Sequence, residues 1–312
     1  MNDVPGHKAN QLTIQQIRSF CRVFERQSYA AAARDLHLAV PTVWEHLKGV
    51  EERYGVRFFV RQGRRIVPSP AAETLHAALL PLLTALDSTF DLVTQPAGPA
   101  ILTVACGMRM LLEDLGAPLR EFHAEFPAVQ LRLLHADLHV AQRWVLDGTV
   151  DLALVLEPDP KRLHPQVVSS AAYANSYLAV FPKRHPLAKE PRVGLKEVVA
   201  HPLILGHTGT SSRQMFDFAL HRLGIDRSPQ VVMETDNAAF TISCVHAGLG
   251  VGIIAGRPGQ SLTKGLLTRN LGQELGEGRV IFLWKRGRQF TAMQTQFMDL
   301  IRQSVSEAPS SP

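Results

Sequence analysis

The hydrophobic pattern of the chain changes near residue 101, and this change divides the fold into two parts. Before it, apolar residues recur at helical spacing from Ile14 onward. After it, short apolar runs such as ILTVAC (101–106) alternate with helical patterns such as LLEDLGAPLREFHAEFP (111–127). Alternating strands and helices indicate an α/β fold with a parallel sheet. Because the alternation starts again at PLIL (202–205), we expect two similar α/β lobes. The same pattern predicts further strands at 129–135, 150–156, 230–234, 251–255 and 280–286, and helices at 137–148, 210–224, 236–250 and from about residue 289 onward.

Two short helical patterns lie close together in YAAAARDLHLAVPTVWEHLKGVEERYG (29–55). Ser28 is a suitable N-cap for the first helix, and Pro41 suits the first turn of the second. Val43 and Leu47 give the second helix a buried face. Its opposite face is then free to enter a DNA major groove, as in helix-turn-helix proteins.

A basic turn follows in RFFVRQGRRIVPSP (57–70), and the alternating pattern around it predicts a small β-hairpin wing with Arg61, Arg64 and Arg65 at its tip. Residues 1–70 contain 11 of the 33 Lys and Arg residues but 6 of the 28 Asp and Glu residues. The net charge of +5 therefore falls in this segment, because the rest of the chain has 22 residues of each sign. Such a segment favours a polyanion such as DNA, although a solvated basic surface gives the same balance.

A long helical pattern at residues 70–95 predicts a linker helix, which Pro81 is expected to kink. The segment QPAGPA after it has the composition of a hinge, which we place at 96–100. The helix has an apolar stripe without an evident partner in the chain, formed by Leu75, Leu79, Leu82, Leu83 and Leu86. We therefore expect this helix to pair with its copy in a second subunit and make a dimer.

From about Leu12 to about Arg302 the chain resembles the LysR-type transcriptional regulators. AAARDLHLAVPTVWEHLKGVEERYGVRFFVRQGRRIVPSPAAETL (31–75) is similar to that family's helix-turn-helix, wing and start of the linker helix. VQLRL, LDGTVDLALV and VHAGLGVGIIA look like landmarks of its effector domain. The resemblance implies an α/β fold class with an N-terminal winged helix-turn-helix and a two-lobed, periplasmic-binding-protein-like effector domain joined by a long linker helix. It also implies tetramers built as dimers of dimers. The expected domains are 12–69 for DNA binding, 70–95 for the linker helix, 96–100 for the hinge and 101–305 for effector binding.

The expected recognition helix departs from the family's pattern at its start. The family usually has Ser-Gln where this chain has Ala39 and Val40, and Ala39 is a poor N-cap. Val40 cannot donate a hydrogen bond to a base but can contact a thymine methyl group. Glu45 stands where a basic or polar residue is common, and it either accepts a hydrogen bond from cytosine N4 or faces solvent. The residues expected to contact double-stranded DNA are Ser28, Ala39, Val40, Thr42, Val43, Glu45, His46, Lys48, Arg53, Arg61, Arg64 and Arg65.

Two α/β lobes joined by crossing strands leave a cleft, where ligands bind at the carboxyl ends of strands and the N-termini of helices. Three loops have this placement: CGMRM (106–110), GHTGTSSRQ (206–214) and ETDNAA (234–239). The second resembles the segment that binds sulfate or acetylserine in the cysteine-biosynthesis branch of the family. The residues expected to contact a small-molecule effector are Gly107, Met108, Arg109, Met110, His207, Thr208, Gly209, Thr210, Ser211, Glu234, Asp236 and Asn237.

Hydroxyl groups and free backbone N–H groups at a helix start suit a carboxylate, sulfate or phosphate, so we expect a small anionic or polar effector. Helix capping is the alternative role for Thr208, Thr210 and Ser211, and equally for the residues of the third loop. Arg109 either pairs with an acidic ligand or faces solvent.

Other classes of protein fit the sequence less well. We find no nucleotide-binding loop, nucleophile elbow or metal-ligand spacing, so we expect no enzyme activity, no metal and no cofactor. The alternative function is a solute-binding receptor of the periplasmic-binding-protein type, which needs a secretion signal that MNDVPGHKANQLT does not resemble. No apolar run approaches the roughly 20 residues that span a bilayer. The three cysteines are far apart and indicate free thiols. We therefore expect a cytoplasmic, homo-oligomeric regulator.

Overall fold

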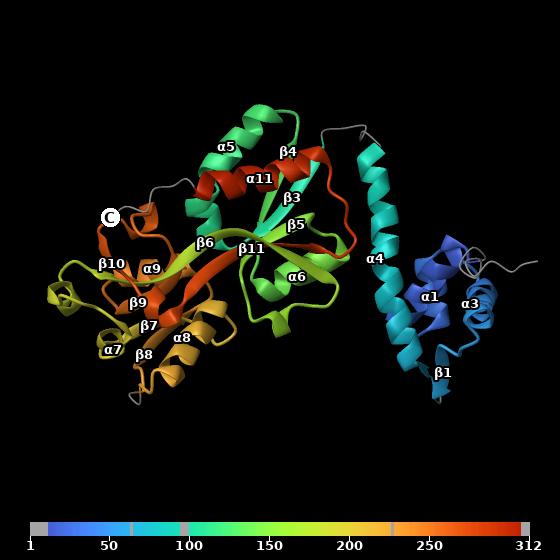
Figure 1. The fold of residues 1–312 in the computed structure, drawn as a ribbon, viewed down its shortest axis with the longest axis horizontal. Helices are drawn as coiled ribbons and strands as arrows, with labels where there is room; N and C mark the ends of the chain where they lie inside the picture. The colour runs from blue at the N-terminus through green and yellow to red at the C-terminus, as the bar shows by residue number, and fades with distance from the viewer. Residues whose placement is uncertain (1–11, 63–64, 94–99, 226–227, 307–312) are drawn as a thin grey trace, which may run out of the picture. The chain divides into compact units, whose positions relative to one another are not determined.

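A computed structural model describes residues 12–62, 65–93, 100–225 and 228–306 (Figure 1). The chain divides into two compact units, Met1–Val93 with the loop Arg286–Gln289, and the remainder from Thr94 onward. The expected hinge at 96–100 lies almost entirely outside the described residues. Each unit is described by itself below.

The first unit begins with three helices packed around one core. Phe20, Val43 and Phe58 are among its buried side chains. Thr13 caps the first helix and exchanges hydrogen bonds with Gln16, and the Ser28 hydroxyl caps the second by accepting from the backbone N–H of Ala31. The helices are α1 (Ile14–Arg26), α2 (Tyr29–Asp35) and α3 (Val40–Tyr54). The sequence pattern therefore predicted the helix-turn-helix correctly.

A two-stranded antiparallel hairpin follows, formed by β1 (Phe59–Gln62) and β2 (Arg65–Pro68). Phe59 is opposite Pro68, and Gln62 is opposite Arg65. Phe58 and Phe59 anchor the hairpin because both pack on Phe20 in the core. This is the predicted wing; its tip at Gly63 and Arg64 lies outside the described residues.

The linker helix α4 (Pro70–Val93) continues through Pro81. Leu79 and Leu83 are buried in the core of the first unit. The expectation that the whole leucine stripe lacks a partner in its own chain is therefore wrong for these two residues, because α1 and its neighbours already cover them. Leu82 is 65% exposed and Phe90 is 64% exposed, so these apolar side chains of the helix lie largely outside that core.

The second unit contains one continuous sheet with the strand order β4-β3-β5-β11-β6-β9-β7-β8, and β10 pairs with β6 beside it. At each end of this order lie three parallel strands, of which the first in the chain is in the middle. These strands are β3 (Ile101–Cys106), β4 (Gln130–His135) and β5 (Leu152–Leu156) in one lobe, and β7 (Leu203–Gly206), β8 (Val231–Thr235) and β9 (Val251–Gly256) in the other. The prediction of two similar α/β lobes is confirmed.

Two long antiparallel strands, β6 (Val167–Pro182) and β11 (Glu277–Lys285), join the lobes in the middle of the sheet (Figure 1). β6 pairs with β11 up to Ser176 and with β9 from Ser176 onward, so it passes from one lobe to the other at this residue. β10 (Leu266–Asn270) pairs with the far half of β6. The sequence pattern predicted neither β6 nor β10.

Helices cover both faces of the sheet in each lobe, because successive strand residues enter different cores. In the first lobe, Leu154 packs with α5 and α11, while Val155 packs with α6. In the second lobe, Leu205 packs with α8 and Ile204 packs with α9. The helices are α5 (Gly116–Glu125), α6 (Leu138–Asp147), α7 (Leu195–Val198), α8 (Ser211–Arg222), α9 (Ala238–His246), α10 (Gly272–Leu275) and α11 (Ala292–Ser306), with a short π-helix at Met110–Asp114 and 3-10 turns at Pro160–Arg162, Pro186–Lys189 and Ser261–Thr263.

Candidate functional site: the outer face of α3 and the cleft between the lobes

One face of α3 is open and combines apolar and basic side chains. Val40 is 44% exposed, Trp44 is 52% exposed, and Lys48 follows one turn later. The Lys48 ammonium lies 5.6 Å from the centre of the Trp44 ring and 3.7 Å from a carboxylate oxygen of Glu52. Residues four apart share one face of a helix, so the side chains of Val40, Trp44 and Lys48 form a continuous surface, which we call the α3 outer face.

Two residues expected to contact DNA lie on the opposite side of α3. Val43 is fully buried in the core, so the prediction that it contacts DNA is wrong. His46 is half-buried, and its Nδ1 lies 2.8 Å from the hydroxyl oxygen of Ser19 on α1. The expectation that His46 faces outward is therefore wrong, because helical spacing directs it toward α1.

The other residues expected at the DNA surface differ in their burial and in the roles that they have within the chain. The Ser28 hydroxyl caps α2, and Ala39 makes no side-chain cap for α3, as its residue type predicts. Thr42 is half-buried, and Arg64 lies outside the described residues, as does the side chain of Arg65. The exposed residues are Ala39, Glu45, Arg53 and Arg61.

A cavity of about 170 Å³ lies between the two lobes of the second unit. Its walls come from the ends of β3, β4, β7 and β8 and from the helices that follow them. This is where a cleft was expected from the strand and helix pattern. Thr208 and Glu234 do not line it, and Glu234 instead accepts a hydrogen bond of 2.7 Å from Arg213. The predicted residues that do line it are Gly107, Met108, Arg109, Met110, His207, Gly209, Thr210, Ser211, Asp236 and Asn237.

Three helices begin at the cavity wall. Asp137 caps α6, Thr210 caps α8 and Asn237 caps α9, each by accepting from a backbone N–H three residues later. Each cap pairs with one N–H group of its helix. Helix capping, the alternative role expected from the sequence, is therefore a role of Thr210 and Asn237. The first N–H groups of the helices, such as those of Ser211 and Ser212, have no partner within the helix. The positive ends of three helix dipoles therefore meet at one cavity.

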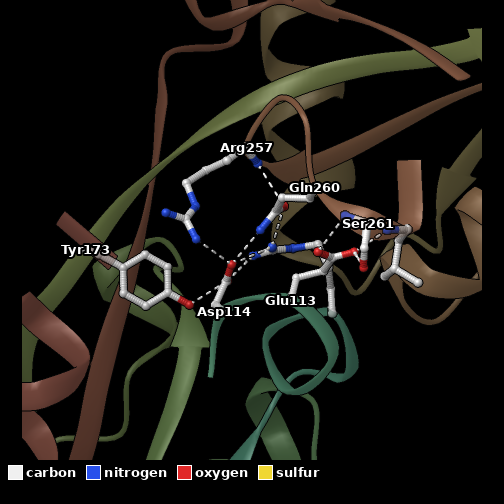
Figure 2. A network of polar contacts seen from close by, with 8 residues as sticks. Glu113, Asp114, Tyr173, Arg257, Gln260 and Ser261 are labelled. Atoms are coloured by element: carbon white, nitrogen blue, oxygen red, sulfur yellow. Dashed lines mark hydrogen bonds and ion pairs between the residues drawn. The ribbon is translucent and has the colours of Figure 1, made fainter. Parts of the chain in front are cut away.

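Arg109 lines the cavity, but its charge is already paired. Its guanidinium donates hydrogen bonds of 3.3 and 2.9 Å to the two carboxylate oxygens of Asp114, and both side chains are buried. Arg257 lies 3.2 Å from the same carboxylate, and the Tyr173 hydroxyl donates to it at 2.7 Å (Figure 2). Arg109 therefore neither faces solvent nor offers an unpaired cation to a ligand.

The pKa values of Asp114 and Tyr173 in this network are shifted in opposite directions. Burial by itself raises the pKa of Asp114, but attraction to Arg109, hydrogen bonds from Arg109 and Tyr173, and attraction to Arg257 leave it below its ordinary value. The pKa of Tyr173 is raised well above its ordinary value by burial and by the neighbouring Asp114 carboxylate. Asp114 is therefore ionised and Tyr173 neutral at pH 7.

Polar contacts join the two lobes at two places. At the first, Gln260 donates to Asp114 at 2.7 Å, and Glu113 accepts from the backbone N–H and hydroxyl of Ser261 at 3.0 and 3.1 Å (Figure 2). At the second, Arg162 donates to the carbonyl oxygen of Gly209 and to Gln214, each at 2.9 Å. Movement of one lobe relative to the other must change these contacts.

The sequence pattern missed several residues of the cavity wall. His135 ends β4, Asp137 caps α6 and His139 lies in the first turn of α6, and the sequence analysis did not select this connection. Asn175 was missed because β6 was not predicted. The missed polar residues are His135, Asp137, His139, Asn175 and Thr241.

The cysteines fit the expected free thiols. Burial raises the pKa of Cys21 and of Cys106 to about 12, so neither is a reactive thiolate at pH 7. Cys244 is half-buried, and its thiol lies 3.1 Å from the sulfur of Met233. Within the described ranges, His, Cys, Asp and Glu side chains form no group of three that could hold a metal ion. In that same part of the chain, no helix has the length and apolar character needed to cross a bilayer.

Comparison with known proteins gives matches over both units. Residues 99–306 match the family model described as the LysR substrate binding domain. Residues 14–73 match the model of the bacterial regulatory helix-turn-helix protein, lysR family. These two matches together cover most of the chain.

Individual regulators are similar to this chain over most of its length. The regulator Cbl of Klebsiella aerogenes is 24% identical over 304 residues, which are 95% of this chain and 94% of that protein. The regulator CysB of Burkholderia cenocepacia is 29% identical over 251 residues, 78% of each chain. HinK, a LysR family transcriptional regulator from Pseudomonas aeruginosa, has a similar fold with a TM-score of 0.56 at 20% identity, over 95% of this chain and 99% of that one. The cofactor-binding domain of Cbl aligns with a TM-score of 0.59 at 19% identity, over 70% of this chain and 97% of that one.

Proposed function

This chain belongs to the LysR family of bacterial transcriptional regulators, and we propose that a small anionic or polar molecule bound between the lobes of its second unit controls how it regulates transcription. The observation that carries the proposal is the cavity of about 170 Å³ at which α6, α8 and α9 all begin. Helix N-termini favour a negatively charged or strongly accepting group. The cavity is therefore suited to one small ligand with such a group.

The ligand is proposed to be held chiefly by α8. Ser211 lines the cavity at the first position of this helix, where a hydroxyl and an unpaired backbone N–H can act together. Arg109 is not proposed to pair with the charge of the ligand, because its guanidinium already forms an ion pair with Asp114. Attraction of an anion here depends on helix dipoles and hydroxyl groups.

Control requires that the ligand bind one arrangement of the lobes more tightly than the other. The contacts of Glu113 with Ser261 and of Arg162 with Gly209 distinguish such arrangements, because they exist only while the lobes keep their present positions. A tenfold difference in affinity corresponds to about 1.4 kcal/mol, which one or two hydrogen bonds supply. The change in the lobes would then alter how the DNA-binding units of the oligomer are presented to DNA.

DNA recognition is proposed to use the α3 outer face together with the basic wing. Lys48 suits a phosphate or guanine, whereas Val40 and Trp44 offer apolar surface that matches the methyl group of thymine. The proposed contact residues are Ala39, Val40, Thr42, Trp44, Glu45, Lys48, Arg53, Arg61, Arg64 and Arg65. Sites rich in thymine within each half-site are the expected targets.

The active form is proposed to be a cytoplasmic homo-oligomer. Leu82 and Phe90 on α4 are apolar and more than half exposed in the single chain. A second α4 laid against these side chains would bring two α3 helices onto spaced half-sites, and a dimer of such dimers would give a tetramer. A solute-binding receptor, the alternative function, would not need the first unit.

The cleft proposal is tested in two steps with the full-length protein. Calorimetric screening of small acids and amino-acid derivatives first identifies a ligand. Ser211→Ala, which keeps α8 helical, should then weaken that ligand about tenfold. The matched control is Thr208→Val, because Thr208 belongs to the same loop but does not line the cavity. Equal affinities for the wild type and Ser211→Ala would place the ligand elsewhere.

DNA binding is tested with promoter fragments by gel shift or fluorescence anisotropy. A chain lacking residues 1–70 should lose measurable affinity. Retention of full affinity by that fragment would refute the assignment of DNA binding to the first unit.

A further inference from the structure

Asn175 has an unusual environment for a polar side chain. It is 4% exposed, it lines the cavity between the lobes, and it lies on the crossing strand β6. Within the described residues, it is the one side chain whose polar atoms, Oδ1 and Nδ2, are both buried without a hydrogen-bond partner. Buried polar groups in proteins are nearly always paired, so an unpaired amide in a cavity needs a functional explanation.

The position of Asn175 on β6 explains why nothing in the protein reaches it. Tyr173, Asn175 and Tyr177 are the buried residues on one side of this segment. Tyr173 belongs to the core of the first lobe and Tyr177 to the core of the second. Asn175 lies between the two cores, one residue before β6 passes from β11 to β9. The cores on both sides are hydrophobic clusters, whereas the residue between them is an asparagine with a polar amide.

None of the described residues forms a hydrogen bond with the side chain of Asn175. Its partner across the ladder is Gly278, which has no side chain. The cavity wall next to β6 is built from apolar residues at the end of β5 and along β9, including Leu156, Ile253 and Ala255. The amide therefore offers one acceptor and two donor hydrogens to whatever occupies the cavity.

We propose that Asn175 determines which effector is accepted, by pairing with a carboxamide group of the ligand. A carboxamide has an acceptor and a donor side by side, so it forms two hydrogen bonds with the Asn175 amide at once. A carboxylate or an ester has only acceptors and leaves the Oδ1 atom of Asn175 unpaired. This inference rests on the proposed function of the cleft and adds the chemical class of the ligand: a small acid with an amide at its other end.

The size of the cavity agrees with such a ligand. A cavity of about 150 Å³ holds one benzene molecule, so about 170 Å³ holds a molecule of roughly six to nine non-hydrogen atoms. Succinamate has a carboxylate at one end and a carboxamide at the other. Its carboxylate suits the helix N-termini and its carboxamide suits Asn175. Monomethyl succinate keeps the carboxylate and replaces the amide by an ester, which makes it the matched probe.

The first experiment measures the Tm of the ligand-free, full-length protein. Asn175→Leu should raise the Tm of the second unit by about 2–4 °C, because it removes a buried amide that the protein does not pair. Asn237→Leu is the matched control and should lower the Tm by a similar amount, because Asn237 caps α9 by accepting from Phe240 at 3.0 Å. A fall in Tm for Asn175→Leu as large as in the control would show that Asn175 supports the fold, and would overturn the proposal.

The second experiment measures binding of the two probes by calorimetry. Succinamate should bind the wild type at least about tenfold more tightly than monomethyl succinate. Asn175→Ala, which leaves space in the cavity, should remove this preference while both probes still bind. If both probes bind the wild type with equal affinity and both bind Ser211→Ala more weakly, the proposed role of Asn175 is wrong but the proposed function of the cleft is not. Binding insensitive to both variants, or no binding at concentrations up to about 10 mM, would overturn the proposed function of the cleft as well.

Discussion

The α3 outer face, proposed to contact DNA, and the cleft between the lobes, proposed to bind a small molecule, differ in the state of their side chains. On α3, Trp44 and Lys48 are exposed and contact one another, so this surface is already formed in the chain without DNA. In the cleft, Asn175 is buried and unpaired, so the recognising group is incomplete until something enters. A surface that reads a large polyanion can rely on exposed charge, because DNA supplies many phosphates. A cavity that selects one small molecule must instead present a few buried polar groups whose pairing decides between candidates.

The two regions also differ in what fixes their side chains. The α3 outer face depends on the buried side of its own helix, where Val43 and Leu47 enter the core. The cleft depends on contacts between distant segments, such as Arg257 with Asp114. Mutations should therefore affect the α3 outer face one residue at a time, whereas a single change in the Asp114 network should affect the whole second unit. The predictions below test this difference, beginning with the largest expected effect.

Replacing Asp114 by Ala should destabilise the second unit by about 3–5 kcal/mol, because the buried guanidinium of Arg109 would lose the carboxylate that pairs with it. Urea unfolding followed by tryptophan fluorescence and circular dichroism measures the loss. The matched variant Glu113→Gln removes a less buried carboxylate from the same helical turn and should cost much less. If both variants had similar stabilities, the Asp114 network would not be the main contact between the lobes.

Replacing Leu82 and Phe90 together by Asp should break the proposed α4 pairing and reduce the size of the oligomer without unfolding the first unit, because both side chains are exposed in the single chain. Each large apolar side chain contributes about 1.5–3 kcal/mol when it is fully buried in an interface. Light scattering measures the change, and circular dichroism checks the fold. Leu79→Asp with Leu83→Asp should instead unfold the first unit, because these residues lie in its core. Persistence of the native oligomer in the Leu82 and Phe90 variant would exclude this face of α4 as the interface.

Acid should weaken the second unit through Asp114 only at low pH. The pKa of Asp114 is lower in the folded protein than in the unfolded chain, so its ionised form stabilises the fold above the unfolded pKa of about 4. That contribution is lost as the pH falls below about 4 and through the folded pKa. Unfolding free energies measured from pH 7 to pH 3 in the wild type and Asp114→Asn should differ in slope only at the acid end. A difference in slope confined to pH 5–7 would contradict the lowered pKa.

Replacing Trp44 by Ala should reduce preference for thymine with little effect on non-specific binding, because apolar contact with a methyl group is worth about 0.8 kcal/mol, or roughly fourfold in affinity. The measurement compares a selected DNA site with the same site containing uracil, which lacks the methyl group. Wild-type protein should bind the uracil site more weakly, and the difference between the two sites should be smaller for Trp44→Ala. Lys48→Ala is the control, since it should weaken both sites alike and lower the salt dependence. An undiminished thymine preference in Trp44→Ala would remove this residue from base recognition.

The cleft residues show how far prediction from the sequence can reach. Thr210 and Ser211 were predicted at the cleft because hydroxyls before a helix that follows a strand lie at a known end of a parallel sheet. Thr208 belongs to the same cluster of hydroxyls but does not line the cavity, since composition cannot tell which side chains of a loop point inward. Arg109 was placed at the cleft correctly, but its pairing with Asp114 could not be predicted. That pair is five residues apart in the chain, and its other partners, Tyr173 and Arg257, lie on distant strands and loops.

The sequence by itself determined the elements whose stability is local or whose pattern is strong. The spacing of Val43 and Leu47, the Ser28 cap and the apolar strands of both lobes specify the winged helix-turn-helix and the two α/β lobes, because each pattern has one period that matches one structure. The tertiary structure alone decided the rest. β6 was not evident because its Ser and Ala residues hide the strand period, and it is stabilised by pairing with β11 and β9 far along the chain. Only that pairing brings Asn175 between the two cores, and only packing against α1 separates Leu79 and Leu83 from the exposed Leu82 on the same helix.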